Sequence, residues 1–177
     1  MKNARIFNLN SRKVLRSLMM IGLSILFFTQ VSAQGGAVNF SGNWALNESK
    51  SKFGDSPFRT ASTIFVVKQD GNALSTERTM AGPDGEMKMT SNYTLDGKVS
   101  ENTGMMDMKS KSTVAWSEDK TSITISTTMV FDMNGESREI KSTETWKLSD
   151  AGNTLTIDST RPGRDGEMKT TAVYDKK

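Results

Sequence analysis

The sequence predicts an all-β fold, a single antiparallel up-and-down β-barrel of about 8–10 strands. The first observation is that apolar and polar residues alternate with a period of two along most of residues 38–174, as they do in half-buried strands. The second is that short turn signals, such as Asp70-Gly71 and Asn134-Gly135, interrupt this alternation. The third is that these residues contain no convincing helical pattern. Closing such a sheet into a barrel removes the exposed edges of its strands.

The first expected strand, residues 38–46, is the stretch around which the others are expected to arrange. Phe40, Gly42, Trp44 and Leu46 share one face of it, and polar or small residues occupy the other. Gly42 lies between two large aromatic residues on the apolar face. A glycine there lets another backbone or ring approach closely, so we expect this strand to bend across one end of the barrel.

The first half of the barrel is expected to follow a loop over residues 47–60. One helical turn around 49–53 is possible, ended by Gly54. Phe53 and Phe58 are expected to plug one end of the barrel. The alternating segments that come next are separated by turns that contain glycine, and they span residues 63–67, 74–80, 87–95 and 99–102.

The second half continues the same pattern. Its alternating segments are separated by short polar turns and span residues 106–116, 123–131, 138–148, 155–157 and 168–174. One turn repeats: 84–88 (Asp-Gly-Glu-Met-Lys) recurs 81 residues later as 165–169. A solenoid would need more copies at a shorter period, so we interpret the repeat as two similar hairpins within one barrel.

The start of the chain has the features of a secretory signal peptide. Residues 1–16 carry five basic residues and no acidic one, an apolar run spans 18–28, and small residues precede the expected cleavage after Ala33. We therefore expect a barrel domain over residues 34–177, exported to the periplasm or secreted. The alternative is a membrane anchor, but the apolar run is shorter than the roughly 20 residues that span a bilayer.

The composition argues against several classes of function. Without the leader, 18 basic residues face 20 acidic ones, so nucleic acid is not an expected partner. The sequence has no histidine and no cysteine, which removes the commonest general base and the commonest transition-metal ligands. No nucleophile motif or phosphate-binding loop is present. We therefore expect a protein that is not an enzyme and binds neither a cofactor nor a metal ion. We also expect it to have no integral membrane segment after cleavage and to be a monomer.

The Phe40-x-Gly42-x-Trp44-x-Leu46 motif resembles the opening strand of the calycins, the superfamily of lipocalins and fatty-acid-binding proteins. The expected number of strands and the closing residues 173–176 are similar to the fatty-acid-binding branch. The 46–53 segment resembles that of bacterial exported lipocalin-like proteins. The resemblance implies a barrel that binds a small hydrophobic or amphipathic molecule. Two features of the fatty-acid-binding branch are absent, because 47–60 is too short for its two-helix lid and Ala172 replaces the Arg of its Arg-x-Tyr motif.

Three charged residues share the faces of apolar neighbours. They are Arg78, Arg138 and Glu144. A charge on such a face costs several kcal/mol unless it is paired or hydrated. One interpretation is a polar site within a hydrophobic cup, with Tyr93 or Tyr174 beside an arginine. The other is a strand end in solvent, or an internal Arg–Glu pair that serves only structure.

Methionine is unusually frequent, since nine of the twelve methionines follow the leader. We expect most of them to face inward and to line a loosely specified pocket, because methionine is flexible and polarizable. The methionines expected to contact a ligand are Met87, Met89, Met106, Met108 and Met129. The 105–108 segment also permits Cu(I) binding, because thioethers are soft ligands. Core filling is the third interpretation.

These observations favour an exported binding protein that holds a small hydrophobic or amphipathic molecule inside its barrel. The alternative is a structural or protein-interaction barrel that its own side chains fill completely. Cu(I) binding by methionines is a more distant third hypothesis.

Overall fold

The computed structural model describes residues 36–54, 61–82, 85–104, 107–133, 136–149, 151–163 and 166–177. The chain divides into two units, 1–34 and 35–177, and the fold presented here is that of the second. The expected signal peptide lies outside the described residues. The described residues form no helix and ten antiparallel strands: β1 (Gly42–Leu46), β2 (Ile64–Asp70), β3 (Ala73–Gly82), β4 (Gly85–Thr94), β5 (Ser100–Thr103), β6 (Lys109–Trp116), β7 (Ser122–Met133), β8 (Glu136–Leu148), β9 (Thr154–Gly163) and β10 (Gly166–Lys176).

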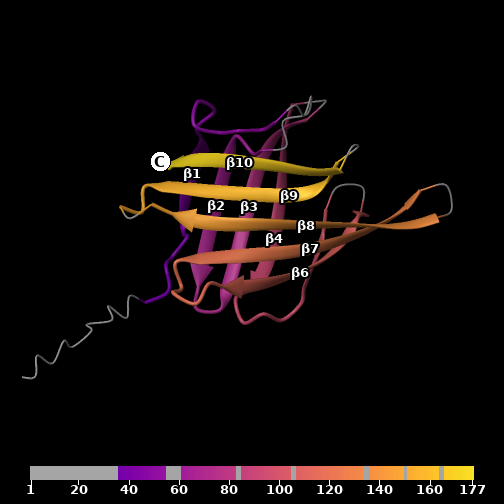
Figure 1. Ribbon diagram of the computed structural model, residues 1–177, viewed down its shortest axis with the longest axis horizontal. Coiled ribbons are helices and arrows are strands. Elements are labelled where there is room, and N and C mark those ends of the chain that lie inside the picture. Colours follow the sequence, from indigo (N-terminus) through magenta and orange to yellow (C-terminus); the bar gives the residue numbers. More distant parts are fainter. Residues whose placement is uncertain are drawn as a thin grey trace, which may run out of the picture. The chain divides into compact units, whose positions relative to one another are not determined.

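All ten strands belong to one sheet with the order β4-β3-β2-β1-β10-β9-β8-β7-β6-β5. Strands that follow one another in sequence are therefore neighbours, and β1 and β10 bring the two ends of the domain together. In Figure 1 the sheet curves so that β1–β4 lie behind β6–β10 and cross them steeply. This is the all-β, up-and-down antiparallel barrel that the alternation predicts.

The barrel is nearly closed, and its seam lies between β4 and β5. These strands form the two ends of the strand order and share no backbone ladder. Side chains bridge them: the Asn92 N–H donates to Asn102 Oδ1 over 2.7 Å, and Asn102 Nδ2 donates to the Asn92 carbonyl over 2.9 Å. The Thr94 N–H donates to the Ser100 hydroxyl over 3.0 Å. The seam therefore pairs exposed backbone groups without a continuous sheet.

The first strand is shorter than the sequence predicts, because a side chain replaces the ladder over its first residues. The strand β1 begins at Gly42. The side chain of Gln69 accepts the Phe40 N–H over 3.0 Å and donates to the Val38 carbonyl over 3.3 Å. Phe40 nevertheless is fully buried, so residues 38–41 close one end of the barrel as expected.

The possible helical turn lies earlier than the predicted 49–53: the N–H groups of Lys50 and Ser51 donate to the carbonyls of Asn47 and Glu48 over 3.3 and 3.2 Å, and the turn ends before Lys52. Lys52 forms an isolated antiparallel bridge with Thr171 of β10, and their N–H groups and carbonyls exchange two hydrogen bonds of 2.7 Å. This segment therefore extends along β10 because the edge of β10 offers it backbone partners. Phe53 is partly buried and packs against the core, and Phe58 lies outside the described residues.

The two repeated hairpins have the same structure. In each, two glycines face each other at the turn: Gly82 and Gly85 in β3–β4, and Gly163 and Gly166 in β9–β10. The second glycine of each pair has a positive φ, 122° and 127°, which a side chain would disfavour. Added Cβ atoms at the first glycines would lie 3.1 Å from the partner's carbonyl oxygen in both hairpins. The repeat is thus a pair of equivalent hairpins within one barrel, as predicted.

Candidate ligand-binding site

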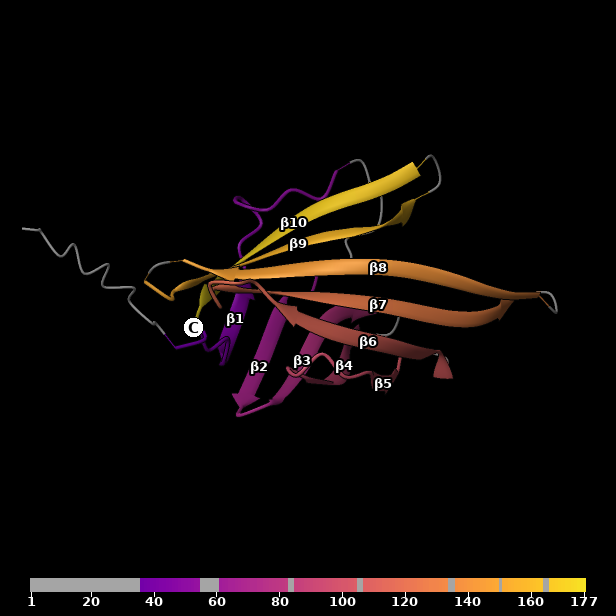
Figure 2. The same ribbon diagram turned by 60° about the horizontal axis from the view of Figure 1, so that its bottom comes forward.

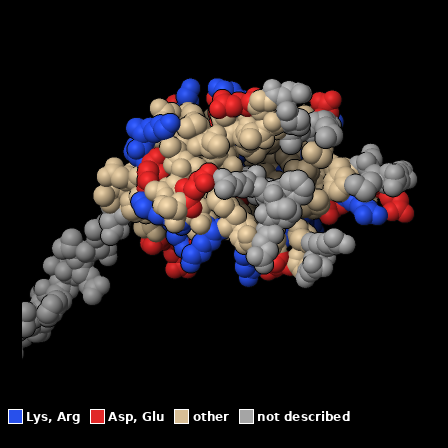
Figure 3. Space-filling view, turned by 90° about the horizontal axis from the view of Figure 1, so that it is seen from above, with Lys and Arg blue, Asp and Glu red and all other residues tan. Residues whose placement is uncertain are grey.

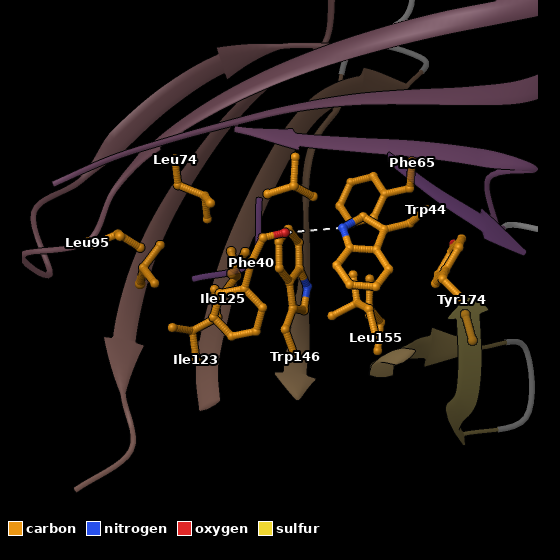
Figure 4. Close-up of a cluster of buried hydrophobic side chains, with 14 residues drawn as sticks. Phe40, Trp44, Phe65, Leu74, Leu95, Ile123, Ile125, Trp146, Leu155 and Tyr174 are labelled. Atoms are coloured by element: carbon orange, nitrogen blue, oxygen red, sulfur yellow. Dashed lines mark hydrogen bonds between the residues drawn. The ribbon is translucent and has the colours of Figure 1, made fainter. Parts of the chain in front are cut away.

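The interior of the barrel has two halves with different packing. The packed half contains the residues that are nearly inaccessible to solvent. Most of them lie toward the strand ends near residues 38–41. The largest are Phe40, Trp44, Phe65, Leu74, Ile123, Ile125, Trp146 and Leu155. Figure 4 shows this cluster, with the indole N–H of Trp44 donating to the Phe40 carbonyl over 3.1 Å.

Aromatic rings hold the packed half together. The ring of Trp146 meets Phe40 and Phe65 edge to face, with centroids 5.9 and 5.1 Å apart. Phe40 also stacks on Trp116, with centroids 6.1 Å apart. Such pairs contribute about 0.5–1.5 kcal/mol each beyond the burial of their area. This half is filled by its own side chains.

The open half lies toward the β3–β4, β7–β8 and β9–β10 turns. Its inward faces carry methionines, as predicted, and each of those with described burial is only half-buried: Met80, Met87, Met89, Met108, Met129 and Met168. On β4 the neighbouring residues Lys88 and Thr90 are exposed, which confirms that the methionines of this strand face inward. None of these methionines joins the buried core. Met106 lies outside the described residues.

An ion pair crosses the interior between the two halves. Arg78 on β3 donates from Nη1 to Glu144 Oε1 over 3.0 Å and from Nη2 to Oε2 over 2.6 Å. The strands β3 and β8 lie on opposite walls, five places apart in the strand order in either direction. The Trp146 indole N–H donates to Glu144 Oε2 over 3.0 Å, and the Arg78 guanidinium lies 4.8 Å from the centre of the Phe65 ring. The pair therefore rests on the aromatic core as the floor of the open half.

The two charges stabilise each other against partial burial. Burial disfavours the charged form of Glu144, but Arg78 and the Trp146 N–H lower the pKa of Glu144 below its ordinary value. Burial also disfavours the charged form of Arg78, but Glu144 outweighs it and raises the pKa of Arg78. The side chains of Arg78 and Glu144 are 22% and 25% exposed, so the pair still meets solvent from the open half.

Two tyrosines accompany the ion pair, as the sequence predicts for Arg78. Burial raises the pKa of Tyr93 and of Tyr174, and the charges of Arg78 and Glu144 act on both phenols. Tyr93 is half-buried, whereas Tyr174 is 2% exposed and packs against Phe65 with ring centroids 5.7 Å apart. Both phenols therefore stay neutral at ordinary pH, and Tyr174 belongs to the floor.

The expectation that Arg138 faces the interior is wrong. Its side chain is 59% exposed and lies 3.6 Å from Glu136. Arg138 pairs with Phe131 near the end of the β7–β8 hairpin, which extends beyond the part of β8 that pairs with β9 (Figure 2). Alternation then no longer distinguishes inside from outside, because no wall faces this part of the hairpin.

An arginine in the segment between residues 157 and 168, which was expected to form a turn, faces the open half instead. The strand β9 continues to Gly163, and Arg161 pairs with Met168 of β10. Arg161 has the parity of Leu155 and Ile157, which are buried, and it is half-buried itself. The period of two continues through Ser159 to Arg161 and could have revealed this position. The Arg-Pro-Gly sequence is typical of a turn, and for this reason the sequence did not indicate that Arg161 lies within a strand.

A cleft opens in the wall where β8 and β9 separate. It has a volume of about 320 Å³ and is lined by Lys141, Ser142, Thr143, Thr160, Arg161, Pro162 and Glu167. A second, more polar hollow of about 360 Å³ lies mainly over the outward residues of β2, β3 and β4, among them Lys68, Glu77 and Thr90. In the view of Figure 3, charged side chains gather at the periphery and uncharged residues border a hollow near the middle.

The part of the chain that the structure describes contains no group of three or more acidic residues that could hold a metal ion. It also contains no helix long and apolar enough to cross a membrane.

The barrel is similar in fold to a protein of known structure. The chain is similar in structure to zebrafish ileal bile acid-binding protein, solved in complex with cholic acid, with a TM-score of 0.53 and 19% sequence identity. The similarity covers 78% of this chain and 98% of the zebrafish protein. No protein family and no curated protein match the sequence.

Proposed function

We propose that this protein is an exported, non-enzymatic barrel that binds a small hydrophobic or amphipathic molecule in its open half. The observation that carries the proposal is the difference in packing between the two halves of the interior. A barrel built only as a solid structural element would bury its large inward side chains throughout. Here every inward methionine with described burial remains half-buried, whereas the aromatic core below the Arg78–Glu144 pair is inaccessible to solvent.

The chemistry of the open half suits an amphipathic ligand. Methionine side chains adapt to different apolar shapes because they are unbranched and polarizable. At the floor, the Arg78–Glu144 pair and Tyr93 offer hydrogen-bonding groups to a polar substituent, and the half-buried Tyr93 hydroxyl carries no charge. Pockets of this kind combine an apolar lining with a few convergent polar groups. The bound molecule of the zebrafish protein, cholic acid, is itself amphipathic.

Export and the absence of catalysis are part of the proposal. The charge distribution and apolar run of residues 1–33 support export with cleavage after Ala33. The lack of histidine, cysteine and a nucleophile motif in the sequence supports binding without chemistry. Mass spectrometry of the protein recovered from an expressing cell's periplasm or medium should show a chain that begins at Gln34. A full-length chain that remains in the cytoplasm would contradict export.

A titration with phenylnaphthylamine, an uncharged probe that fluoresces in apolar surroundings, tests the binding site. We expect the purified protein to bind this probe with micromolar affinity. Met89→Trp should weaken binding about tenfold, because a larger side chain then fills the space above Arg78, the cross-strand partner of Met89. Urea unfolding of the variant establishes that the barrel remains folded.

The matched control is Thr90→Trp, which places the same side chain on the outer face of the same strand. Thr90 is exposed and lines the outer hollow. We expect this variant to bind the probe as the wild type does. Loss of binding in Thr90→Trp alone would place the site in the outer hollow, and no binding by the wild-type protein would support the solid barrel instead.

A further inference from the structure

We propose that the cleft between β8 and β9 is an anion site, in which Arg161 binds the carboxylate or sulfonate head of an amphiphile whose apolar part occupies the open half. This inference rests on the proposed function. It adds a class of ligand, a head group position and a route through the wall of the barrel.

The cleft exists because two hairpins diverge. The ladder between β8 and β9 runs from Leu148↔Leu155 to Thr143↔Thr160 and ends there. Beyond it, β8 continues with β7 alone while β9 continues with β10 (Figure 2). Backbone hydrogen bonds therefore do not close this part of the wall, and the cleft occupies the opening.

The lining residues show that the cleft reaches the interior. Lys141 and Thr160 have outward parity, whereas Ser142 and Arg161 have the inward parity of Glu144 and Ile157. All four line the same cleft of about 320 Å³. We infer from this mixed lining that the cleft passes between the strands, so that a molecule in it would contact both the solvent and the open half.

The charges of the cleft favour an anion. Arg161 forms no salt bridge with a described residue, and Lys141 forms only an exposed one, 3.7 Å from Glu139. The one acidic lining residue, Glu167, lies 3.5 Å from Lys169 on its own strand. A half-buried guanidinium gains most from a charged hydrogen-bond acceptor. Carboxylates and sulfonates provide such an acceptor.

The deeper arginine is not available for this role. Both η nitrogens of Arg78 already donate to Glu144. A second anion at Arg78 would compete with the Glu144 carboxylate, which also accepts a hydrogen bond from the indole N–H of Trp146. An anionic head group is therefore better accommodated at Arg161, near the opening of the barrel, than at the floor.

The repeated hairpin shows that Arg161 is not required for the fold. Met80 occupies the position equivalent to Arg161, 81 residues earlier, and it pairs with Met87 as Arg161 pairs with Met168. The glycines that flank the two turns have the same geometry. The substitution Arg161→Met therefore gives β9–β10 the side chain that its counterpart carries at the equivalent position, and it removes the charge.

The test uses two probes with the same ring system, one neutral and one anionic: phenylnaphthylamine and anilinonaphthalene sulfonate. We expect Arg161→Met to weaken binding of the sulfonate about tenfold, the typical loss for a hydrogen bond to a charged group, and to leave the neutral probe unchanged. Glu167→Gln should tighten sulfonate binding about twofold because it removes the acidic group of the cleft. The charge-matched control is Arg138→Met, which lies on the exposed hairpin and should alter neither affinity.

The outcomes separate this inference from the proposed function. If the wild-type protein binds neither probe, the proposed function fails. If it binds both, and Arg161→Met affects them equally or affects neither, the anion site is wrong while the binding barrel stands. A loss of sulfonate binding in Arg138→Met as large as in Arg161→Met would also overturn the anion site, because it would indicate a general effect of net charge. Equal urea midpoints of wild type and Arg161→Met exclude unfolding as the cause.

Discussion

The packed half and the open half are built from the same strands, yet their inward side chains differ in burial. On β8, Trp146 is fully buried and Glu144 is paired, whereas Ile140 of the same parity is 38% exposed. On β4, Leu95 just beyond the strand belongs to the core, whereas Met87 and Met89 are half-buried. Rigid aromatic and branched residues occupy the packed half, and flexible methionines occupy the half that we propose to bind the ligand. We therefore expect substitutions in the packed half to lower mainly the stability of the protein, and substitutions in the open half to affect mainly ligand binding.

The largest expected effect compares two side chains of similar size, one in each half. Leu155→Ala should lower the free energy of unfolding by about 3 kcal/mol, because Leu155 is fully buried and truncation leaves a cavity. Met129→Ala should cost about 1 kcal/mol, because the side chain is already half-exposed. Urea unfolding of both variants measures the difference. Equal losses would mean that the two halves are packed alike.

Breaking the Arg78–Glu144 ion pair should give the next largest loss of stability. Arg78→Met should destabilise the protein by about 2–3 kcal/mol, because it leaves Glu144 charged, partly buried and with only the Trp146 N–H as a side-chain partner. The double variant Arg78→Met with Glu144→Met should recover much of this loss, since no charge then remains unpaired. A double-mutant cycle in urea measures the coupling. If the two losses simply add, the charges do not depend on each other.

Acid should weaken the Arg78–Glu144 ion pair. The pKa of Glu144 in the folded protein is lowered below its ordinary value of 4.5, so its pairing contributes stability above that pH. The contribution is lost as the pH falls through the folded-state pKa, because the unfolded chain binds the proton first. Unfolding at pH 7 and pH 3 should show a larger loss in the wild type than in the Arg78→Met, Glu144→Met double variant. The same pH dependence in both proteins would contradict this assignment.

The smallest expected effect concerns the seam between β4 and β5. Asn102→Ala removes both hydrogen bonds to the backbone of Asn92. Because Asn92 is exposed, water can replace them, and we expect a loss of only about 1 kcal/mol. Amide exchange of Asn92 should nevertheless become several-fold faster, whereas exchange within β9–β10, on the opposite side, should not change. Faster exchange in both regions would indicate that the seam controls the whole barrel.

The alternation of residues determined most of the fold by itself. Phe40 and Trp44 lie in the interior as predicted, and so do Met87 and Met89 of β4, because a period of two leaves only one face for the apolar side chains. The glycines of the repeated segments likewise indicate two equivalent hairpins, because each chain reversal requires a positive φ at Gly85 or Gly166. Such features depend on neighbours in sequence, so they can be inferred without coordinates.

The tertiary structure alone decided which inward positions meet another wall. Arg78 and Arg138 have the same parity as their apolar neighbours, but Arg78 finds Glu144 across the barrel while Arg138 lies on a hairpin that extends past it. Arg161, beside a proline and a glycine, faces the open half because β9 continues to pair with β10. The physical reason is that alternation specifies a face of a strand. Whether that face is covered depends on where distant strands end, and this depends on pairings among residues far apart in the sequence.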